Sequence, residues 1–186
     1  VCSIRVRVTD NTARFFEKFI TVTVQNVLEL TDIDGNQYNT VVIGNQEWMA
    51  ENLKVTRFAN GESIPSILDG TQWAGLTTPG RCIYNNDVTY LNTYGRLYNW
   101  YAAADARGVC PNGWFLPGQF EWQALAPNAM GPFGNIGDQF GADLKDVSTW
   151  SPAGTNSTGF TARPGGRREF NGGFGGVGLS KPPAFH

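Results

Sequence analysis

The chain has little of what most catalytic and metal sites require. Its only histidine is the last residue, His186, whereas a Ser/His/Asp triad needs a histidine base held firmly beside its nucleophile. Cys2, Cys82 and Cys110 show no CxxC or Cys/His spacing, which argues against a structural zinc site. Three cysteines allow one disulfide, and their spacing does not identify the pair.

Charged residues are scarce as well, at 16% of 186 residues with a net charge of -2. Only Arg167 and Arg168 are adjacent among the basic residues, so the polybasic patch typical of nucleic-acid binding is missing. No apolar run approaches the roughly 20 residues of a membrane-spanning helix. We therefore expect neither a nucleic-acid partner nor membrane insertion. Strand-like sequence begins directly at Val1, so we expect a cut through a longer polypeptide with any export signal upstream.

Glycine and aromatic residues are abundant: Gly 23, Trp 6, Tyr 6 and Phe 12, with 41% hydrophobic residues overall. A helical bundle needs charged outer faces and few glycines. Many glycines and aromatics with few charges instead favour short strands, tight turns and ordered loops. The composition predicts a loop-rich domain.

Residues 1–27 predict two strands joined by a turn. Apolar and polar residues alternate over 3–9 and again over 19–24. An isolated two-stranded hairpin is marginally stable, so we expect the last two strands of a partial β-sandwich, and the segment resembles the end of a cadherin-like or Ig-like repeat. A break between two packing units is expected at 26–31, giving domains over 1–27 and 28–186.

The second unit alternates short elements with loops. Residues 37–49 predict a hairpin and residues 54–93 a long ordered loop region rich in Gly, Pro, Asn and Thr. The alanine-rich segment 97–104 predicts a helix, and a second short helix is expected to begin at Glu121. Residues 160–162 read as a strand. The predicted fold class is α+β, with two short helices and small antiparallel sheets.

Six segments of this unit, in order, carry a family resemblance: "DIDGNQYNTVVIGNQEWMAENLKV", "YNND", "YGRLYNWYAA", "CPNGWFLPGQFEWQAL", "GADLK" and "TNSTGFTARPGGRREFNGGF". Together they resemble the Fibrobacter succinogenes major paralogous domain, over about Thr31 to Phe174. The resemblance implies a bacterial exported or surface protein. It also implies a fold like that of C-type lectins and formylglycine-generating enzymes, as in the variable proteins of diversity-generating retroelements.

The C-terminal part departs from the family pattern. Phe115 stands where His is common, and the family's closing "WSS"-type and "G-x-x-V-R-C" segments are replaced by "GGVGLSKPP" before His186. We therefore expect an incomplete domain, with residues 172–178 poorly anchored and 180–186 outside the core. The resemblance places the usual partner of Cys110 in the lost strand, so that cysteine is expected to be a free thiol unless it has taken Cys82 as a substitute partner.

The apolar members of the matched segments should form one buried cluster in mutual contact. They are Trp48, Tyr98, Trp100, Trp114, Leu116, Trp122 and Leu125. Trp73 and Trp150 lie in predicted loops instead, where an aromatic ring can stack on a sugar or anchor a partner. The alternative for both is that the ring tucks under its own loop.

Ligand-binding candidates therefore combine these loop tryptophans with polar residues near the Gly-rich turn. The set is Trp73, Trp150, Arg163, Arg167, Arg168 and Asn171. Calcium is the one cofactor left open, with Asn85, Asn86 and Asp87 as its candidate ligands, because calcium prefers several oxygen ligands. Asn/Asp clusters also form turns, which is the competing interpretation.

The expected function is recognition by a non-enzymatic module of a secreted or cell-surface protein, with loops on a rigid scaffold holding a glycan or a protein. A structural spacer is the main alternative. Glu121 beside Trp122 could serve as a glycosidase acid, but the helix dipole explains the Glu and core packing the Trp. Kinship with formylglycine-generating enzymes does not transfer their oxidase chemistry, because paired active-site cysteines are not recognisable. The sequence leaves the oligomeric state open.

Overall fold

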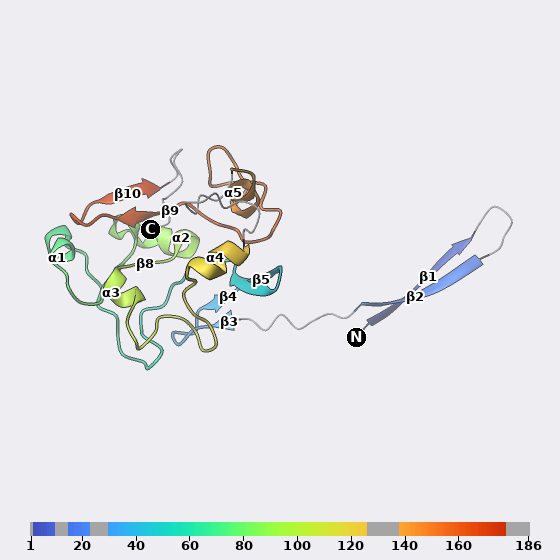
Figure 1. The fold of residues 1–186 in the computed structure, drawn as a ribbon, viewed down its shortest axis with the longest axis horizontal. Coiled ribbons are helices and arrows are strands. Elements are labelled where there is room, and N and C mark those ends of the chain that lie inside the picture. The colour runs from blue at the N-terminus through green and yellow to red at the C-terminus, as the bar shows by residue number, and fades with distance from the viewer. Residues whose placement is uncertain (1, 10–14, 23–29, 126–137, 178–186) are drawn as a thin grey trace.

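The computed structural model describes residues 2–9, 15–22, 30–125 and 138–177. Within them, short helices alternate with five two-stranded antiparallel sheets (Figure 1). The predicted α+β class is confirmed, although the described residues form five short α-helices rather than two. No helix in these ranges is both long and apolar enough to cross a bilayer.

The first sheet pairs β1 (Cys2–Thr9) with β2 (Phe15–Val22). Cys2 lies opposite Val22 and Thr9 opposite Phe15. The two predicted strands are present, and the second begins earlier than its alternation indicated. The segment 23–29 lies outside the described residues, so the division into two domains stays a prediction.

The next two sheets build the predicted hairpin region. β3 (Leu30–Thr31) pairs with β4 (Gln37–Tyr38), and β5 (Thr40–Ile43) pairs with β6 (Gln46–Met49). The hairpin expected over 37–49 is therefore confirmed for β5 and β6, while β4 turns back onto β3. The carboxylate of Asp32 holds that turn by accepting hydrogen bonds from the backbone N–H groups of Asp34 and Asn36, 2.9 Å each, and from the Tyr38 hydroxyl at 2.6 Å.

The region expected to be loop over 54–93 contains several very short elements. They are α1 (Gly70–Ala74), β7 (Arg81–Cys82), the 3-10 turns η1 (Tyr84–Asn86) and η2 (Val88–Tyr90), and α2 (Leu91–Tyr94). Side chains stabilise their ends: the Asp69 carboxylate accepts from the Gln72 N–H at the start of α1. The region is ordered, as predicted, but the sequence analysis did not predict the short helices, strand and 3-10 turns that it contains.

The predicted helix over 97–104 is wrong in its first half. Residues 97 and 98 form β8 (Leu97–Tyr98), which pairs with β7, and the helix α3 spans only Trp100–Ala103. Asn99 separates the two, because its Oδ1 accepts from the N–H groups of Ala102 and Gly80. An Asn side chain used in this way begins a helix and prevents it from extending backwards.

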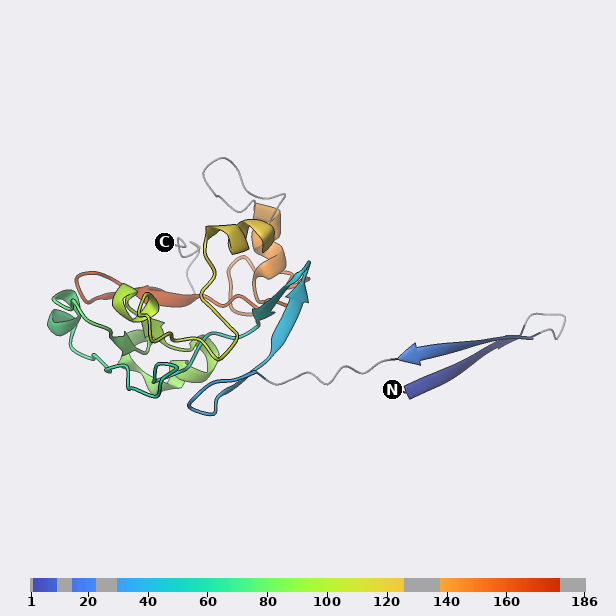
Figure 2. The same cartoon turned by 60° about the horizontal axis from the view of Figure 1, so that its bottom comes forward.

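The C-terminal half supplies the remaining elements: α4 (Gln119–Leu125), α5 (Asp138–Leu144), β9 (Gly165–Arg168) and β10 (Phe174–Val177). α4 is the predicted second helix. Figures 1 and 2 show α4 and α5 on the same side of the β5–β6 hairpin. The strand expected over 160–162 is reduced to one isolated bridge between Ala162 and Lys145.

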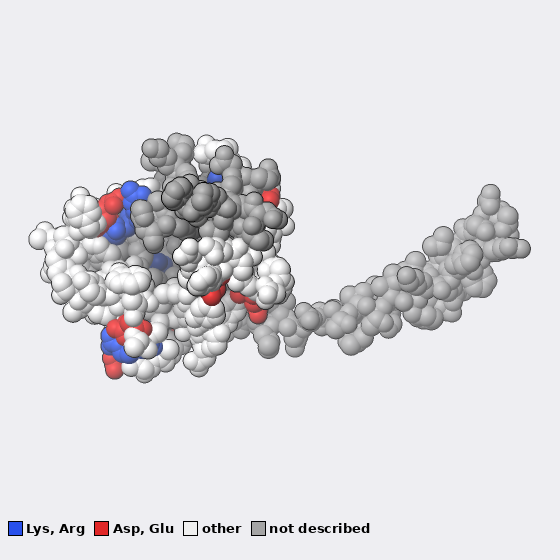
Figure 3. Space-filling view, viewed as in Figure 1, with Lys and Arg blue, Asp and Glu red and all other residues white. Residues whose placement is uncertain are grey.

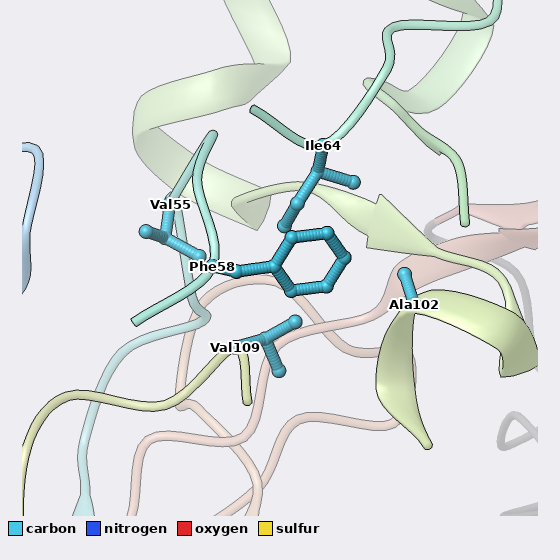
Figure 4. Packing of buried hydrophobic residues seen from close by; sticks show 5 residues of the cluster. All are labelled: Val55, Phe58, Ile64, Ala102 and Val109. Carbon is cyan, nitrogen blue, oxygen red and sulfur yellow. The ribbon is translucent and has the colours of Figure 1, made fainter. Parts of the chain in front are cut away.

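Two hydrophobic clusters replace the single core that the sequence predicted. The first contains Val55, Phe58, Ile64, Ala102 and Val109, which point toward one another in Figure 4. The second contains Trp48, Leu125 and Leu144, with Trp122 and Phe160 packed against it; the Trp48 and Trp122 ring centroids are 5.0 Å apart.

The predicted core residues divide accordingly. Trp48 and Leu125 are buried in the second cluster, and Tyr98 packs against the first. Trp100 is 77% exposed and Leu116 47% exposed, so the prediction is wrong for both. Trp100 lies in a helix of four residues whose buried member is Ala102, so only one side of α3 reaches the core.

The glycine-rich segment near the C-terminus is better anchored than expected. β10 pairs with β9, and the N–H of Glu169 donates to the Gly173 carbonyl at 2.8 Å. Gly172 is buried with φ +85°, and a Cβ there would lie 2.0 Å from the Gly70 carbonyl oxygen. The predicted looseness of 172–178 is therefore wrong through Val177, and residues 178–186 lie outside the described part of the chain.

Candidate ligand-binding site

A cavity of about 300 Å³ opens beside β8 and α3, and we call it the β8 cavity. In Figure 3 the surface over β8 is hollowed, and Lys or Arg atoms lie within the hollow. Its polar lining residues are Asn52, Tyr94, Arg96, Tyr98 and Arg163. The rest of its described lining is Leu53, Leu97, Ala103, Val109, Leu116, Gly165 and Gly166.

Two glycines let backbone segments approach closely at one wall. A Cβ on Gly165 would lie 3.3 Å from Asn52 Nδ2 and 3.4 Å from the Tyr94 carbonyl oxygen. Gly95 has φ +67°, and a Cβ there would lie 2.7 Å from the Leu53 carbonyl oxygen. Asn52 Nδ2 donates to the Tyr94 carbonyl at 3.0 Å, which ties this wall together across the sequence. The cavity therefore depends on glycine where a side chain would displace its neighbours.

Arg163 is the first of two guanidinium groups in the cavity. Its Nη1 donates to the Thr93 carbonyl at 3.2 Å, whereas its Nε is buried without a hydrogen-bond partner among the described atoms. The nearest carboxylate oxygen, Asp146 Oδ2, is 4.0 Å from that Nε. Because this Nε has almost no accessible surface, a ligand cannot reach it. Nη2 makes no hydrogen bond to the described residues and is the Arg163 donor left for a ligand.

Asp146 is an incomplete partner for this arginine. Its Oδ1 accepts from the N–H and hydroxyl groups of Ser148 and Thr149, at 2.8 to 3.1 Å. Burial raises the pKa of Asp146, but these hydrogen bonds outweigh it and hold the pKa below its ordinary value. The carboxylate is therefore ionised at neutral pH and orients Arg163 from beyond hydrogen-bond distance.

Arg96 is the second guanidinium group. Its Nε donates to the Lys54 carbonyl at 2.8 Å, which fixes the side chain while leaving two terminal nitrogens with no hydrogen bond to the described residues. Burial lowers the pKa of the neighbouring Arg81, and the positive charge of Arg96 lowers that pKa further. This side of the domain therefore concentrates positive charge.

Two exposed aromatic residues lie close in the sequence to residues that line the cavity. Trp100 precedes the lining residue Ala103 by one turn of α3, and the 68% exposed Phe115 directly precedes the lining residue Leu116. Large exposed aromatics beside a polar cavity are typical of binding surfaces, because their rings offer flat contact area at little entropic cost.

Comparison with known proteins identifies the family. The model of the Fibrobacter succinogenes major domain matches residues 41–179 of the 186-residue chain. The chain belongs to this family. The match confirms the resemblance carried by the six sequence segments. No curated protein and no solved structure matches the chain.

Among the six residues predicted to bind ligand, only Arg163 lines the β8 cavity of this Fibrobacter succinogenes major domain. Arg168 lies elsewhere, between the rings of Trp73 and Phe174 at 4.6 and 4.7 Å. Its nitrogens donate to the carbonyls of Ile67 and Leu68, at 2.6 and 2.9 Å. Trp73 is buried under this arginine and lies in α1 rather than in the predicted loop. The pair therefore joins α1 to β9, and a ligand role for it stays a prediction.

The other three candidates also make contacts within the domain. Trp150 Nε1 donates to the Ala162 carbonyl at 2.6 Å. Arg167 pairs with Glu169 at 2.7 Å, and Asn171 Oδ1 accepts from the Gly173 N–H in the turn between β9 and β10. The structure does not bring these side chains to the β8 cavity.

The candidate calcium ligands form a turn. Asn85 and Asn86 have φ of 51° and 56°, and Asn86 Nδ2 donates to the Leu68 carbonyl. Asp87 Oδ1 accepts from the N–H and hydroxyl of Thr89, which lowers the pKa of this exposed carboxyl. In the described part of the chain, no three His, Cys, Asp or Glu residues are grouped to hold a metal ion. Calcium binding stays a prediction, and the turn interpretation accounts for these contacts.

The cysteines of the described core are unpaired. Cys82 is buried and Cys110 half-buried, and both are free thiols. Burial raises the pKa of each thiol, and Arg168 offsets part of that effect at Cys82. The prediction that Cys110 is a free thiol is therefore confirmed.

Sequence reasoning missed Arg96 and Asn52 as site residues. Arg96 is the one charge in the aromatic segment "YGRLYNWYAA", and a lone arginine among apolar neighbours was the available signal. Asn52 offered no such signal, because its place in the wall depends on a contact with Tyr94, 42 positions away.

Proposed function

We propose that this domain is a non-enzymatic ligand-binding module of a secreted or cell-surface bacterial protein, and that the β8 cavity binds a glycan. The observation that carries the proposal is a cavity lined by residues with polar donors, with exposed aromatic residues next to its lining residues in the chain. A volume of about 300 Å³ is at the lower end of the roughly 300–1,000 Å³ of small-molecule sites. It suits one or two sugar units better than a protein surface.

The lining argues against an enzyme at this site. Among the described lining residues there is no carboxylate, histidine, cysteine or serine, whereas glycoside hydrolysis generally uses two carboxyl groups and covalent catalysis an activated nucleophile. Glu121 lies outside that lining, and its Oε2 accepts from the Gly118 N–H at 2.7 Å. Its contacts are those of a residue that caps α4.

We also propose that the fold is C-type-lectin-like. The support is a loop-rich α+β chain with short helices and small sheets, together with membership of this family. In such an architecture the scaffold fixes loops that carry the ligand contacts. A structural spacer would share the scaffold but would have no use for unpaired guanidinium donors in a cavity.

A glycan array probed with the 186-residue chain, with and without calcium, tests the function. Ala103→Leu should abolish binding by filling the cavity, and Trp100→Ala should weaken it about tenfold through loss of the aromatic contact, about 1.4 kcal/mol. Phe170→Ala removes an aromatic ring that is 88% exposed and outside the described lining, so it is the matched control. A chain that retains no glycan would refute this function and favour the spacer. Equal losses in Phe170→Ala and Trp100→Ala would refute the site.

A further inference from the structure

We infer that the β8 cavity selects acidic glycans, with the carboxylate of a uronic-acid unit held by Arg96 and Arg163. This inference rests on the proposed glycan-binding function and names its substrate class. Two arginines line the cavity, and none of its described lining residues is acidic. Asp146 already balances part of the charge of Arg163, whereas Arg96 forms no ion pair with the described residues, and a ligand carboxylate would supply one.

The hydrogen bonds already made by the two arginines leave donors for a ligand. Arg163 uses Nη1 on the Thr93 carbonyl, and its Nη2 makes no hydrogen bond to the described residues. Arg96 uses Nε on the Lys54 carbonyl. The guanidinium fork matches a planar carboxylate through paired N–H donors. Each arginine is thus anchored by one bond and retains others for the ligand.

The protein's own carboxylates do not saturate this positive charge. Asp146 is 4.0 Å from Arg163 Nε, and Ser148 and Thr149 already donate to its Oδ1. Arg81 lies close enough to Arg96 for the charge of Arg96 to lower its pKa. In Figure 3 acidic atoms are visible on this face, but none lies within the hollow. The local field therefore favours an anion in the cavity.

The remaining lining suits the body of a sugar ring. Leu97 and Leu116 supply apolar surface, and Tyr94 and Asn52 supply polar atoms at the same cavity. A uronic acid combines a ring with apolar and polar faces and one carboxylate, so it can use both parts of the lining at once. Sulfated sugars share the negative charge but present a tetrahedral group, and they form a separate arm of the test.

Calorimetric titration of the full chain tests this inference with oligosaccharides of galacturonate, glucuronate and mannuronate. Each is paired with its methyl ester, which has the same backbone without the charge. At least one acid should bind about tenfold or more tightly than its ester, a difference of about 1.4 kcal/mol. Arg163→Gln and Arg96→Gln should each remove most of that preference, while ester binding changes less than twofold.

Arg57→Gln is the matched control, because it removes one charge from a 52% exposed arginine outside the described lining. Arg163→Lys should retain part of the preference, since it keeps the charge and loses the fork. Circular dichroism and melting midpoints identify any variant that fails to fold, in which case Ala103→Leu must abolish acid binding for the site to stand. Acids and esters that bind equally would overturn the inference and leave the glycan proposal intact. Tighter binding of sulfated oligosaccharides would overturn the carboxylate assignment, and absence of all glycan binding would refute the proposed function itself.

Discussion

Replacement of Trp48 by alanine should remove the centre of the second hydrophobic cluster. The Trp48 side chain is 8% exposed, and its ring lies 5.0 Å from that of Trp122 and 5.7 Å from that of Phe160. Truncating a buried aromatic residue costs about 3–5 kcal/mol. Because Trp48 Nε1 is buried without an acceptor among the described atoms, the substitution also removes an unpaired donor, which costs about 1–3 kcal/mol to bury. We therefore expect a loss near the lower end, about 3 kcal/mol.

A loss of this size is a large share of the total stability, since domains of this kind are stable by about 5–15 kcal/mol. It corresponds to a fall in melting temperature of roughly 6–12 °C. Urea unfolding followed by tryptophan fluorescence and far-UV circular dichroism measures it. Trp48→Phe keeps an aromatic ring and removes the unpaired N–H, so it should cost at most about 1 kcal/mol.

Trp100→Ala is the matched control, because it removes the same side chain from a 77% exposed position. Its effect should stay within about 0.5 kcal/mol. Equal losses in Trp48→Ala and Trp100→Ala would refute the division into buried and exposed tryptophans. A loss in Trp48→Phe as large as in Trp48→Ala would show that the indole N–H has a partner and that the packing argument is incomplete.

Two further stability predictions follow from close contacts. Tyr38→Phe removes the hydroxyl that donates to Asp32 at 2.6 Å; it should cost about 1–3 kcal/mol in urea unfolding, because a buried carboxylate oxygen loses a donor, and an unchanged midpoint would contradict the role of this bond. Gly172→Ala should destabilise by more than about 2 kcal/mol, since its Cβ would meet the Gly70 backbone at 2.0 Å and its φ is positive. Gly113→Ala shares the positive φ but has nothing within 4 Å of the added Cβ, so it isolates the backbone term, and equal losses would show that the close approach to Gly70 has no effect.

Sequence patterns correctly predicted the helices and strands that are held by contacts between residues close in the sequence. Alternation over 37–49 indicated the β5–β6 hairpin, and the Glu-Trp segment indicated α4, whose first turn contains Glu121. The prediction failed at 97–104, where alanines favour a helix but the Asn99 side chain bonds the backbone of both α3 and the segment before β7. That second contact joins residues 19 positions apart, and no helical propensity contains it.

The sequence alone could not show which tryptophans are buried and which are exposed. Trp48 and Trp100 both lie in family segments, yet one is buried and the other exposed. Trp73, assigned to a loop ligand site, is buried beneath Arg168. The exposure of each ring depends on which segment covers it, and those covering segments come from distant parts of the chain. Burial of this kind follows from tertiary packing and leaves no periodic signal in so short an element.

The site was predictable only in part for the same reason. Arg163 stood out near the Gly-rich turn, but its anchor is the carbonyl of Thr93, 70 positions away. Arg96 is held by Lys54, 42 positions away. A cavity assembled across such separations exists only once β8, β9 and the loop after β6 have packed together. Arg163 could be named from sequence, but the convergence of Arg96, Arg163 and Asn52 on one cavity could not be predicted.

Some residues that line the cavity also belong to the hydrophobic core and others do not, and this difference determines which of them could be exchanged to change the ligand. Val109, Leu53 and Tyr98 belong to the first hydrophobic cluster and also form part of the cavity lining. Arg96 and Arg163 lie outside both clusters, so exchanging these two residues would alter charge in the cavity at little cost in core packing. Part of the cavity lining is shared with the hydrophobic core, whereas Arg96 and Arg163 are not. Related domains could therefore keep one scaffold and carry different binding residues at these two positions. In this chain these positions carry two arginines, so the preference for an acidic sugar should depend on them, whereas the packing of the two hydrophobic clusters should not.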